Sequence, residues 1–330
     1  MTRHTIFLDG AFIPADSRMI ESLSPGHLKA RGVFETMAAD SGKIVLLDQH
    51  LMRLKKGLEI LEIKSPYSNQ KLREYIDTLL SQFVSLRPRR SSAGEAISLK
   101  DCFVPPSPPS LCLALRSKAK QRGRSSGGPR NDATQNARVR LTIWQDHTKT
   151  HASIVSLPYE PFSQRQYEQG FQAMISKIRF PRSPRWSCVK SLDCSSLFQA
   201  YAEAKSQGYD EALILNAKGC LAEASRSNIF FVVKGELWTP ALSCGGLKGI
   251  TRGVVIAVAK EMGIKVKMVQ LRLSQIKRAQ EAFLTNSLIG IMPLTSIDGK
   301  TIGQGKMGNW TREIRERANL QFSVCPGGAR

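Results

Sequence analysis

The sequence predicts a mixed α/β (α+β) fold with room for two domains. Short segments in which apolar and polar residues alternate recur along the chain, as in half-buried strands, and Asp-Gly pairs supply tight turns beside some of them. Longer segments between them repeat apolar residues every three or four positions, as amphipathic helices do. The chain has 330 residues, of which 42% are apolar, so it can bury a large core.

The first 85 residues predict a hairpin, two further strands and two helices. An Asp9-Gly10 turn joins the strands of the hairpin, because this pair readily adopts the positive φ of a tight turn. Asp48 is expected to cap the first helix, whose buried face carries leucines at helical spacing. The expected strands are Ile6–Leu8, Phe12–Ile13, Arg31–Ala38 and Ile44–Leu47, the leucines are Leu51, Leu54, Leu58 and Leu61, and the second helix runs near Asn69–Val84.

The composition changes abruptly after this second helix. Residues 87–130 contain ten Lys or Arg but only two acidic residues, with many prolines, Ser-Gly clusters and no regular apolar period. Such a segment cannot bury enough apolar surface to offset its conformational entropy, so we predict a disordered basic insertion at about residues 87–136. It supplies +8 of the formal net charge of +21. A nucleic-acid partner would depend mainly on this tract, and we do not favour one.

Strand and helix patterns resume after the insertion. Val139, Leu141 and Ile143 alternate with polar residues, which predicts a half-buried strand. Residues 158–161 begin and end with proline and are expected to be a linker. Further strands are expected at Ala152–Leu157, Phe171–Ser176, Tyr209–Asn216, Ile229–Val233, Lys265–Leu271 and Ala282–Thr285 and in a hairpin at Ser296–Ile302, and helices are expected from Ser195 or Ser196 to Gln207, after Thr251, and at Met307–Phe322.

The composition also excludes several classes of protein. The seven cysteines are scattered without a C-x-x-C pair or zinc-finger spacing, so we expect free thiols and no metal site. No apolar run reaches the roughly 18 to 20 residues that a membrane span needs. The first residues lack the apolar core of a signal peptide. We therefore expect a soluble cytoplasmic protein.

The stretch from Leu221 to Gly263 carries the features on which the functional interpretation is built. It begins near the acidic residue Glu223, passes through a strand pattern and reaches a glycine-rich loop, GGLKGIT, at residues 245–251. This loop leads directly into an amphipathic helix. Unpaired backbone N–H groups at a helix N-terminus, together with the helix dipole, favour an anion such as phosphate. Taken alone, however, such a loop more often only turns the chain.

Neighbouring segments make the interpretation specific. EASRSNIFFV, LKGITRGVVIAVAKEMGI and EAFLTNSLIGIMPLTSIDG, with RGVFETM and LDQHLMRL upstream, together resemble the class IV (fold-type IV) pyridoxal-phosphate enzymes. That family holds the branched-chain and D-amino-acid aminotransferases and 4-amino-4-deoxychorismate lyase. The similarity covers most of residues 5–86 and 137–320. It implies a two-domain architecture like that of D-amino-acid aminotransferase, with pyridoxal 5′-phosphate between the domains of a homodimer.

The resemblance also implies roles for individual residues, each of which would be read as structural if it stood alone. Lys190, in a K-S-L motif, would be the Schiff-base lysine and the catalytic residue, and Glu223 would face the pyridine nitrogen. Arg53 of the H-x-x-R-L motif would reach the phosphate, since its planar fork suits phosphate oxygens. The other implied contacts are the backbone amides of Ile250 and Thr251 and the Ser287 side chain at the phosphate, Leu247 on the ring face, and Phe34 and Trp144 on the substrate side.

The motifs leave the substrate open. An amino-acid transaminase that passes an α-amino group to a 2-oxo acid, with a branched-chain-type substrate, is the favoured function, and 4-amino-4-deoxychorismate lyase is the alternative. Thr36 after Phe34-Glu35 favours the lyase and D-amino-acid side, whereas Trp144-Gln145 replaces an arginine and glycine of the D-amino-acid branch. Asp193-Cys194 stands where the family often has a tyrosine beside the ring hydroxyl. A further alternative is an inactive relative that binds nucleic acid through the basic insertion.

The predicted domains are residues 1–157, a small α/β domain that includes the insertion, and residues 158–322, a larger cofactor-binding domain, followed by a tail at 323–330. The expected partners are an amino acid, a 2-oxo acid and a second copy of the chain, without a membrane.

Overall fold

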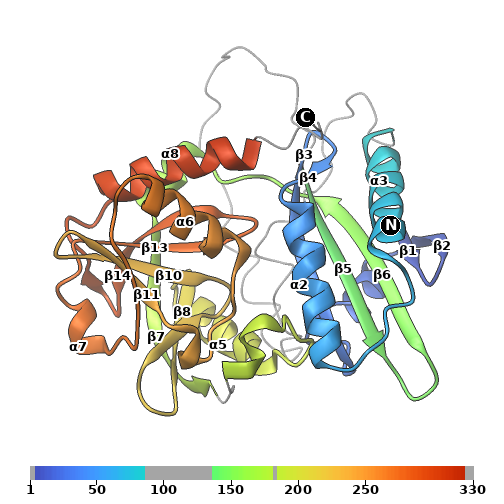
Figure 1. Cartoon of the computed structure of the whole chain (residues 1–330), viewed down its shortest axis with the longest axis horizontal. Helices are drawn as coiled ribbons and strands as arrows, with labels where there is room; N and C mark the ends of the chain where they lie inside the picture. Colours follow the sequence, from blue (N-terminus) through green and yellow to red (C-terminus); the bar gives the residue numbers. More distant parts are fainter. Residues whose placement is uncertain (1–3, 86–135, 181–183, 324–330) are drawn as a thin grey trace, which may run out of the picture.

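The computed structural model describes residues 4–85, 136–180 and 184–323. Within these residues two β-sheets lie side by side, one formed by residues 4–158 and the other by residues 171–301 (Figure 1). The prediction of a mixed α/β fold is confirmed. The predicted insertion lies outside the described residues except for Asn136, and so does the tail from residue 324. No described helix is long and apolar enough to cross a membrane.

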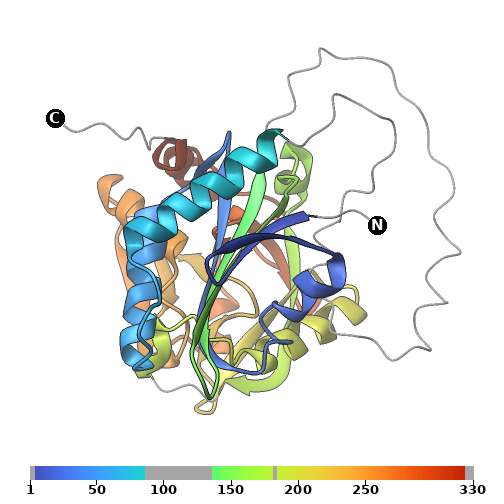
Figure 2. The same cartoon turned by 90° about the vertical axis from the view of Figure 1, so that its right-hand side faces the viewer.

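The first sheet has six strands in the order β2-β1-β6-β5-β3-β4, and every neighbouring pair is antiparallel. Helices α2 (Leu47–Ile60) and α3 (Asn69–Ser85) pack on this sheet (Figure 2). The predicted leucines of α2 are buried against it, and the Asp9-Gly10 turn has the expected positive φ angles. The strands are β1 (His4–Leu8), β2 (Ala11–Ala15), β3 (Arg31–Asp40), β4 (Lys43–Ile44), β5 (Ala137–Gln145) and β6 (Thr150–Pro158), and α1 (Ser17–Ser22) follows β2.

Some predictions for this sheet are wrong in detail. The strand expected at Ile44–Leu47 is shorter, because Leu46 adopts a left-handed conformation and α2 begins at Leu47. Asp48 therefore lies in the first turn instead of capping the helix, and it pairs with Arg73. Strand β5 was expected to be half-buried, but both of its faces are buried. One face meets the helices, and on the other Arg140 donates to the carbonyl of Ile20 in α1 at 3.2 Å.

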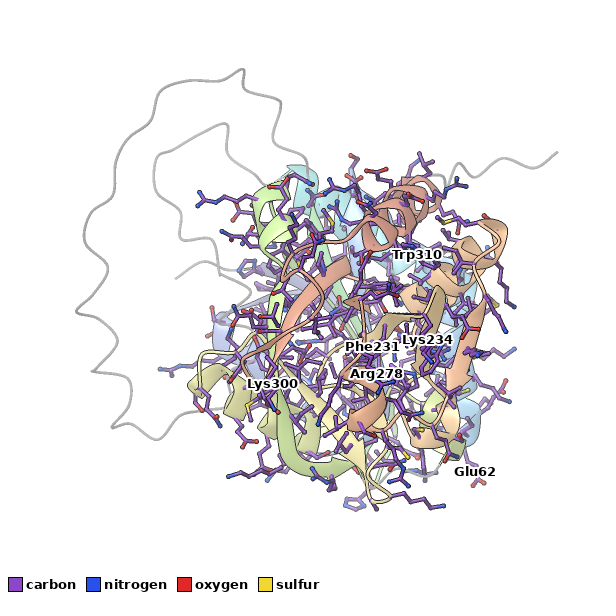
Figure 3. All side chains as sticks on the ribbon, turned by 90° about the vertical axis from the view of Figure 1, so that its left-hand side faces the viewer. Glu62, Phe231, Lys234, Arg278, Lys300 and Trp310 are labelled. Atoms are coloured by element: carbon purple, nitrogen blue, oxygen red, sulfur yellow. The ribbon has the colours of Figure 1, made fainter. Side chains whose placement is uncertain are left out.

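The second sheet has nine strands, in the order β12-β11-β10-β13-β14-β7-β8-β9 with β15 beside β14. Helix α5 packs on β7 and β8, and α6 and α8 pack on β13. Phe231 of β10 is buried in this sheet, whereas Lys234 lies exposed at the following turn (Figure 3). The strands are β7 (Phe171–Phe180), β8 (Glu211–Asn216), β9 (Leu221–Ala224), β10 (Asn228–Val233), β11 (Glu236–Pro240), β12 (Val266–Val269), β13 (Glu281–Asn286), β14 (Gly290–Ile297) and β15 (Lys300–Thr301).

The helices around the second sheet agree with the predicted ones and add several short turns. The predicted helices are α5 (Ser195–Ser206), α6 (Ile250–Glu261) and α8 (Asn309–Ser323). The additional short helices are α4 (Gln164–Gln169) and α7 (Leu273–Ile276), with 3₁₀ turns η1 (Pro184–Cys188) and η2 (Leu242–Cys244).

The chain segment before α5 joins the two sheets. The backbone N–H of Phe34 in β3 donates to the carbonyl of Lys190 at 2.9 Å, and that of Leu192 donates to the carbonyl of Gly32 at 3.0 Å. A Cβ atom at Gly32 would lie 2.5 Å from the carbonyl oxygen of Ile143 and 2.8 Å from Leu192 Cδ1. The close approach of these three segments therefore requires glycine at position 32.

We predict that Gly32→Ala lowers the free energy of unfolding by about 1 to 3 kcal/mol, because the carbonyl of Ile143 cannot move away without disturbing the pairing of β3 with β5. Gly253→Ala is the control, since nothing lies within 4 Å of a Cβ atom added there inside α6. It should stabilise the protein by about 0.5 to 1 kcal/mol. Denaturant unfolding measures both variants, and equal stabilities would contradict the packing argument.

Candidate active site

A cavity of about 1080 Å³ has walls from both sheets. The first sheet contributes β3 and α2, and the second contributes β9, the loop before α6 and the β13–β14 connection. Most of the residues predicted from the sequence line this one cavity, and they are Phe34, Arg53, Lys190, Glu223, Leu247, Ile250, Thr251 and Ser287. Segments that are far apart in the sequence therefore meet at one site.

Lys190 stands where the joining segment meets β3. Its Nζ atom lies 4.6 Å from the centroid of the Phe34 ring, with which it makes a cation–π contact. Burial lowers the pKa of Lys190 below its ordinary value, and the positive charge of Arg53 lowers it further. A lysine in this environment loses its proton more readily than a surface lysine does, which makes its amine available as a nucleophile.

Arg53 is held by the buried carboxylate of Glu35. Its Nε donates to Glu35 Oε1 at 2.8 Å and its Nη2 to Oε2 at 2.6 Å, while Nη1 reaches the carbonyl of Lys248 at 3.3 Å. Burial alone would raise the pKa of Glu35, but Arg53 and His50 outweigh it and hold the pKa at about 2. The edge of the guanidinium formed by Nε and Nη2 is thus already occupied, which the sequence did not reveal.

Glu223 connects β9 to the glycine-rich loop. Its Oε2 atom accepts the backbone N–H of Leu247 at 2.8 Å and the side-chain amide of Asn228 at 3.4 Å. The same Asn228 amide donates to the carbonyl of Leu247 at 2.8 Å. A Cβ atom at Gly249 would collide with the Asn228 side chain, so the loop lies directly on this asparagine. These contacts fix the carboxylate and the loop relative to each other.

The N-terminus of α6 faces the cavity through Ile250 and Thr251. Its N-cap residue is Gly249, and no side chain caps the helix. The first N–H groups of a helix have no partner within the helix, so these amides provide hydrogen-bond donors beside a positive helix end. This arrangement suits an anionic group, as the sequence predicted.

Ser287 lies on the connection between β13 and β14, opposite α2. Its Oγ atom is 3.4 Å from Nε2 of His50. Two tyrosine hydroxyls fix this connection, with Tyr167 donating to the carbonyl of Ile289 at 2.9 Å and Tyr159 donating to that of Leu288. Ser287 is therefore presented by an anchored loop.

Comparisons with known proteins decide the family. The family model for amino-transferase class IV matches residues 32–127 and 128–297. The chain belongs to this family. A relative from Methanocaldococcus jannaschii with the provisional name branched-chain-amino-acid aminotransferase is 30% identical over 94% of each chain. A D-alanine aminotransferase from Listeria monocytogenes is 24% identical over 94% of this chain and 93% of that relative.

Solved structures give the same fold for this class IV aminotransferase. A branched-chain amino acid aminotransferase from Thermoproteus uzoniensis, solved with norvaline, superposes with a TM-score of 0.70 at 22% identity, over 98% of this chain and 96% of that one. The branched-chain amino acid aminotransferase from Escherichia coli gives a TM-score of 0.69 at 22% identity, over 96% of this chain and 92% of that one. A third, the T.th. branched-chain enzyme solved with pyridoxamine 5′-phosphate, gives a TM-score of 0.74 at 22% identity, over 99% of this chain and 96% of that one. The predicted fold-type IV architecture is confirmed.

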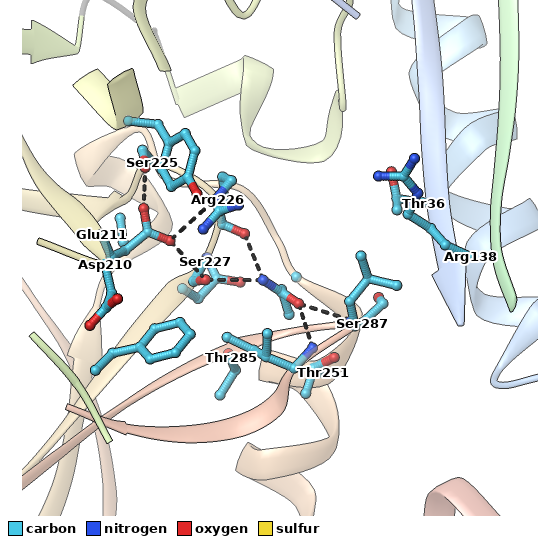
Figure 4. Close-up of a pocket in the computed structure, with 18 of the residues that line it drawn as sticks. Thr36, Arg138, Asp210, Glu211, Ser225, Arg226, Ser227, Thr251, Thr285 and Ser287 are labelled. Carbon is cyan, nitrogen blue, oxygen red and sulfur yellow. Dashed lines mark hydrogen bonds and ion pairs between the residues drawn. The ribbon is translucent and has the colours of Figure 1, made fainter. Parts of the chain in front are cut away.

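The class IV aminotransferase cavity also contains polar residues that were not predicted as site residues. On the far side from β3, Ser225 and Ser227 donate to the buried carboxylate of Glu211, and the guanidinium of Arg226 stacks on the Tyr201 ring at 3.5 Å (Figure 4). This cluster fixes the chain directly after Glu223 in β9. Ser225, Arg226 and Ser227 stand in the EASRSNIFFV motif, but no role was predicted for them or for Glu211, which read only as part of a strand.

Arg138 and Thr36 line the cavity from the first sheet (Figure 4). Arg138 is only 7% exposed, yet its side chain makes no hydrogen bond or ion pair with another described residue. In the sequence it read only as one of the polar residues that alternate along β5. A largely buried guanidinium that lines a cavity and has no partner among the described residues is suited to an anionic ligand.

Trp144 is the predicted site residue that the cavity wall does not include. It packs behind Phe34 and Leu192, and the ring of His151 stacks on it with centroids 5.0 Å apart. Cys194, at the position where the family often has a tyrosine, does line the cavity. Among the described residues, no group of three or more His, Cys, Asp or Glu could hold a metal ion.

We predict that Glu35→Gln costs about 3 to 5 kcal/mol of stability at neutral pH, because it leaves the buried charge of Arg53 without its partner. The pKa of Glu35 lies below its ordinary value of 4.5, so its contribution is present above that pH and is lost as the pH falls towards 2. Urea unfolding should therefore show that, between pH 4.5 and pH 2, the free energy of unfolding falls less steeply in the variant than in the wild type. Asp48→Asn, which breaks an exposed pair with Arg73, is the control and should cost less than about 1 kcal/mol. Equal losses in both variants would contradict the prediction.

Proposed function

We propose that the protein is a pyridoxal 5′-phosphate-dependent amino-acid transaminase with Lys190 as the residue that attaches the cofactor. The observation that carries this proposal is that one cavity combines the lysine of lowered pKa, the carboxylate of Glu223 and the uncapped N-terminus of α6. A nucleophilic amine, an acid and an anion site are the three protein parts that such chemistry requires.

The residues present fit this cofactor. Its aldehyde needs an amine, which Lys190 offers, and its phosphate needs N–H donors and positive charge, which α6 and Arg53 offer. Its pyridine nitrogen needs an acidic partner, and Glu223 is held in place by Leu247 and Asn228. The cavity volume of about 1080 Å³ leaves room for a substrate beside the cofactor.

Each residue has a distinct part in the proposed reaction. Bound pyridoxal phosphate supplies an electron sink for a bond broken at the substrate Cα. Lys190 Nζ would take the proton from the substrate Cα as a general base, for which a lowered pKa is required. Glu223 would hold a proton at the pyridine nitrogen through a charge-assisted hydrogen bond. Leu247 would contact the ring, and Phe34 would limit the substrate side.

For the substrates we propose a branched-chain-type amino acid and a 2-oxo acid. Relatives in both comparisons bear the name branched-chain aminotransferase, which supports the first. Arg138 supports the second, since its buried guanidinium can receive a carboxylate through paired hydrogen bonds.

We also propose that the two sheets are the cores of two domains divided near residue 158. Two further proposals are a homodimer, which rests on the family resemblance, and a cytoplasmic location, which rests on the composition of the sequence.

The first test concerns cofactor attachment. Reconstituted with pyridoxal 5′-phosphate, the protein should be yellow, and borohydride should fix the cofactor to it as an added mass. Lys190→Ala should abolish the fixed cofactor because the attaching amine is gone. Lys248→Ala, which removes an exposed lysine from the neighbouring loop, is the matched control and should keep it. A wild-type protein that stays colourless with excess cofactor would refute the proposed function.

The second test concerns the carboxylate at Arg138. Arg138→Met should reduce kcat/KM for L-glutamate and 2-oxoglutarate by about a hundredfold, since a hydrogen bond to a charged group contributes about 1.5 to 3 kcal/mol. If Arg138 binds the side-chain carboxylate, kcat/KM for L-leucine should fall much less. If it binds the α-carboxylate, both amino acids should be affected alike.

If Arg138→Met keeps wild-type activity with both amino acids, the proposed role of this arginine is excluded.

The same assay distinguishes the transaminase from the alternative function, the lyase. A wild-type protein that transaminates no amino acid but releases pyruvate from aminodeoxychorismate is the lyase.

A further inference from the structure

A chain of buried polar contacts links α2 to the β13–β14 connection. Arg53 donates twice to Glu35, His50 Nδ1 lies 2.7 Å from Glu35 Oε2, and His50 Nε2 lies 3.4 Å from Ser287 Oγ. Glu35 and His50 are 0% and 1% exposed, so no solvent competes for these contacts. The Ser287 hydroxyl at the end of the chain faces the cavity near Thr251.

The position of each proton along this chain follows from the donors and acceptors. Glu35 is ionised and can only accept, so His50 Nδ1 must carry a proton and donate it. In a neutral imidazole the other nitrogen is then an acceptor, and the Ser287 hydroxyl must donate to it. In this state Ser287 presents only lone pairs to the cavity.

The doubly protonated imidazole reverses the last contact. His50 Nε2 then donates to Ser287 Oγ, and the serine hydroxyl proton is released to point into the cavity. We propose that Ser287 donates to the cofactor phosphate only when His50 is doubly protonated, so that binding of a phosphate monoester takes up a proton at His50. This inference rests on the proposed function, because it requires the phosphate to lie beside Ser287.

The charges around His50 set the direction of the effect. Glu35 from β3 and Arg53 from α2 face it, Lys190 lies near, and Ser287 is the neutral contact from the second sheet. Burial lowers the pKa of His50 below its ordinary value of 6.5, and the charges of Arg53 and Lys190 lower it further against the opposing effect of Glu35. A dianionic phosphate beside Ser287 favours the protonated imidazole, so the pKa of His50 is higher in the protein with bound phosphate than in the free protein. Binding of the phosphate should therefore be tightest at low pH. It should weaken as the pH rises from the pKa of His50 in the free protein to its pKa in the complex.

The experiment measures proton uptake with a probe that cannot react with Lys190. The probe is 4′-deoxypyridoxine 5′-phosphate, which lacks the aldehyde, and calorimetric titrations in buffers of different ionisation enthalpy count the protons taken up on binding. Between about pH 7 and pH 9 the phosphate itself remains largely dianionic. Wild-type protein should take up as much as one proton more than Ser287→Ala, and its Kd should rise by up to about tenfold per pH unit in the coupled range.

Two further variants separate a positioning role from a merely structural one. Ser287→Thr retains the hydroxyl and should restore the proton uptake, whereas His50→Gln cannot titrate and should bind with the low uptake of Ser287→Ala. Protonation of the probe ring next to Glu223 is common to all these proteins and cancels in the comparison.

The outcomes separate the two proposals. If wild type and Ser287→Ala bind the probe with equal proton uptake, the coupling of His50 to the phosphate through Ser287 is refuted while the proposed function stands. If wild-type protein does not bind the probe, the proposed function fails and this inference fails with it.

Discussion

The backbone pairing between β3 and the segment that carries Lys190 is the constraint on which the site depends. It consists of the hydrogen bonds from Phe34 to Lys190 and from Leu192 to Gly32, and it crosses from one sheet to the other. Because strand residues alternate between faces, successive side chains of β3 lie on opposite faces of the sheet. Phe34 and Thr36 line the cavity, whereas Glu35 faces α2. One strand therefore positions both the lysine and the carboxylate that holds Arg53.

The distribution of buried charge around the cavity favours anions. Arg53 is neutralised by Glu35, and Arg138 has no partner among the described residues. Lys190 forms no ion pair with a described carboxylate, although the charges of Glu35 and Glu223 raise its pKa against the effects of burial and Arg53. Glu223 is the acid on the opposite wall, tied to the glycine-rich loop. A ligand that carries a phosphate at one end and a carboxylate at the other would place negative charge near both Lys190 and Arg138. An amino acid joined to a phosphorylated cofactor is such a ligand.

The sequence predicted the elements of the fold well because their signals are local. The Asp9-Gly10 turn and the leucines of α2 each depend on a few neighbouring residues. The errors arose where tertiary structure overrides the local pattern. Leu46 takes a left-handed conformation that no propensity indicates, and β5 is buried on both faces because other segments cover its polar side.

Only those site residues that stand in recognisable motifs could be predicted from the sequence. Lys190, Arg53 and Glu223 stand in motifs, and the structure brings them to one cavity. Arg138 and Glu211 have no motif of their own, and their importance depends on burial, which a single sequence does not give. Trp144 was assigned to the substrate side from the family resemblance, yet it lies within β5 and packs against Phe34 outside the cavity wall.

The contacts of Arg53 also limit how a phosphate can approach it. Glu35 occupies Nε and one hydrogen of Nη2, so the bidentate edge that the sequence argument assumed for phosphate is used within the protein. Nη1 already points to the carbonyl of Lys248 in the glycine-rich loop. The hydrogens of Arg53 that Glu35 leaves free are on Nη1 and Nη2, and Nη1 lies beside the loop that leads into α6. Glu35 thus holds the guanidinium beside this loop, so a phosphate bound at the α6 amides would reach Arg53 through these remaining hydrogens and not through the Nε edge.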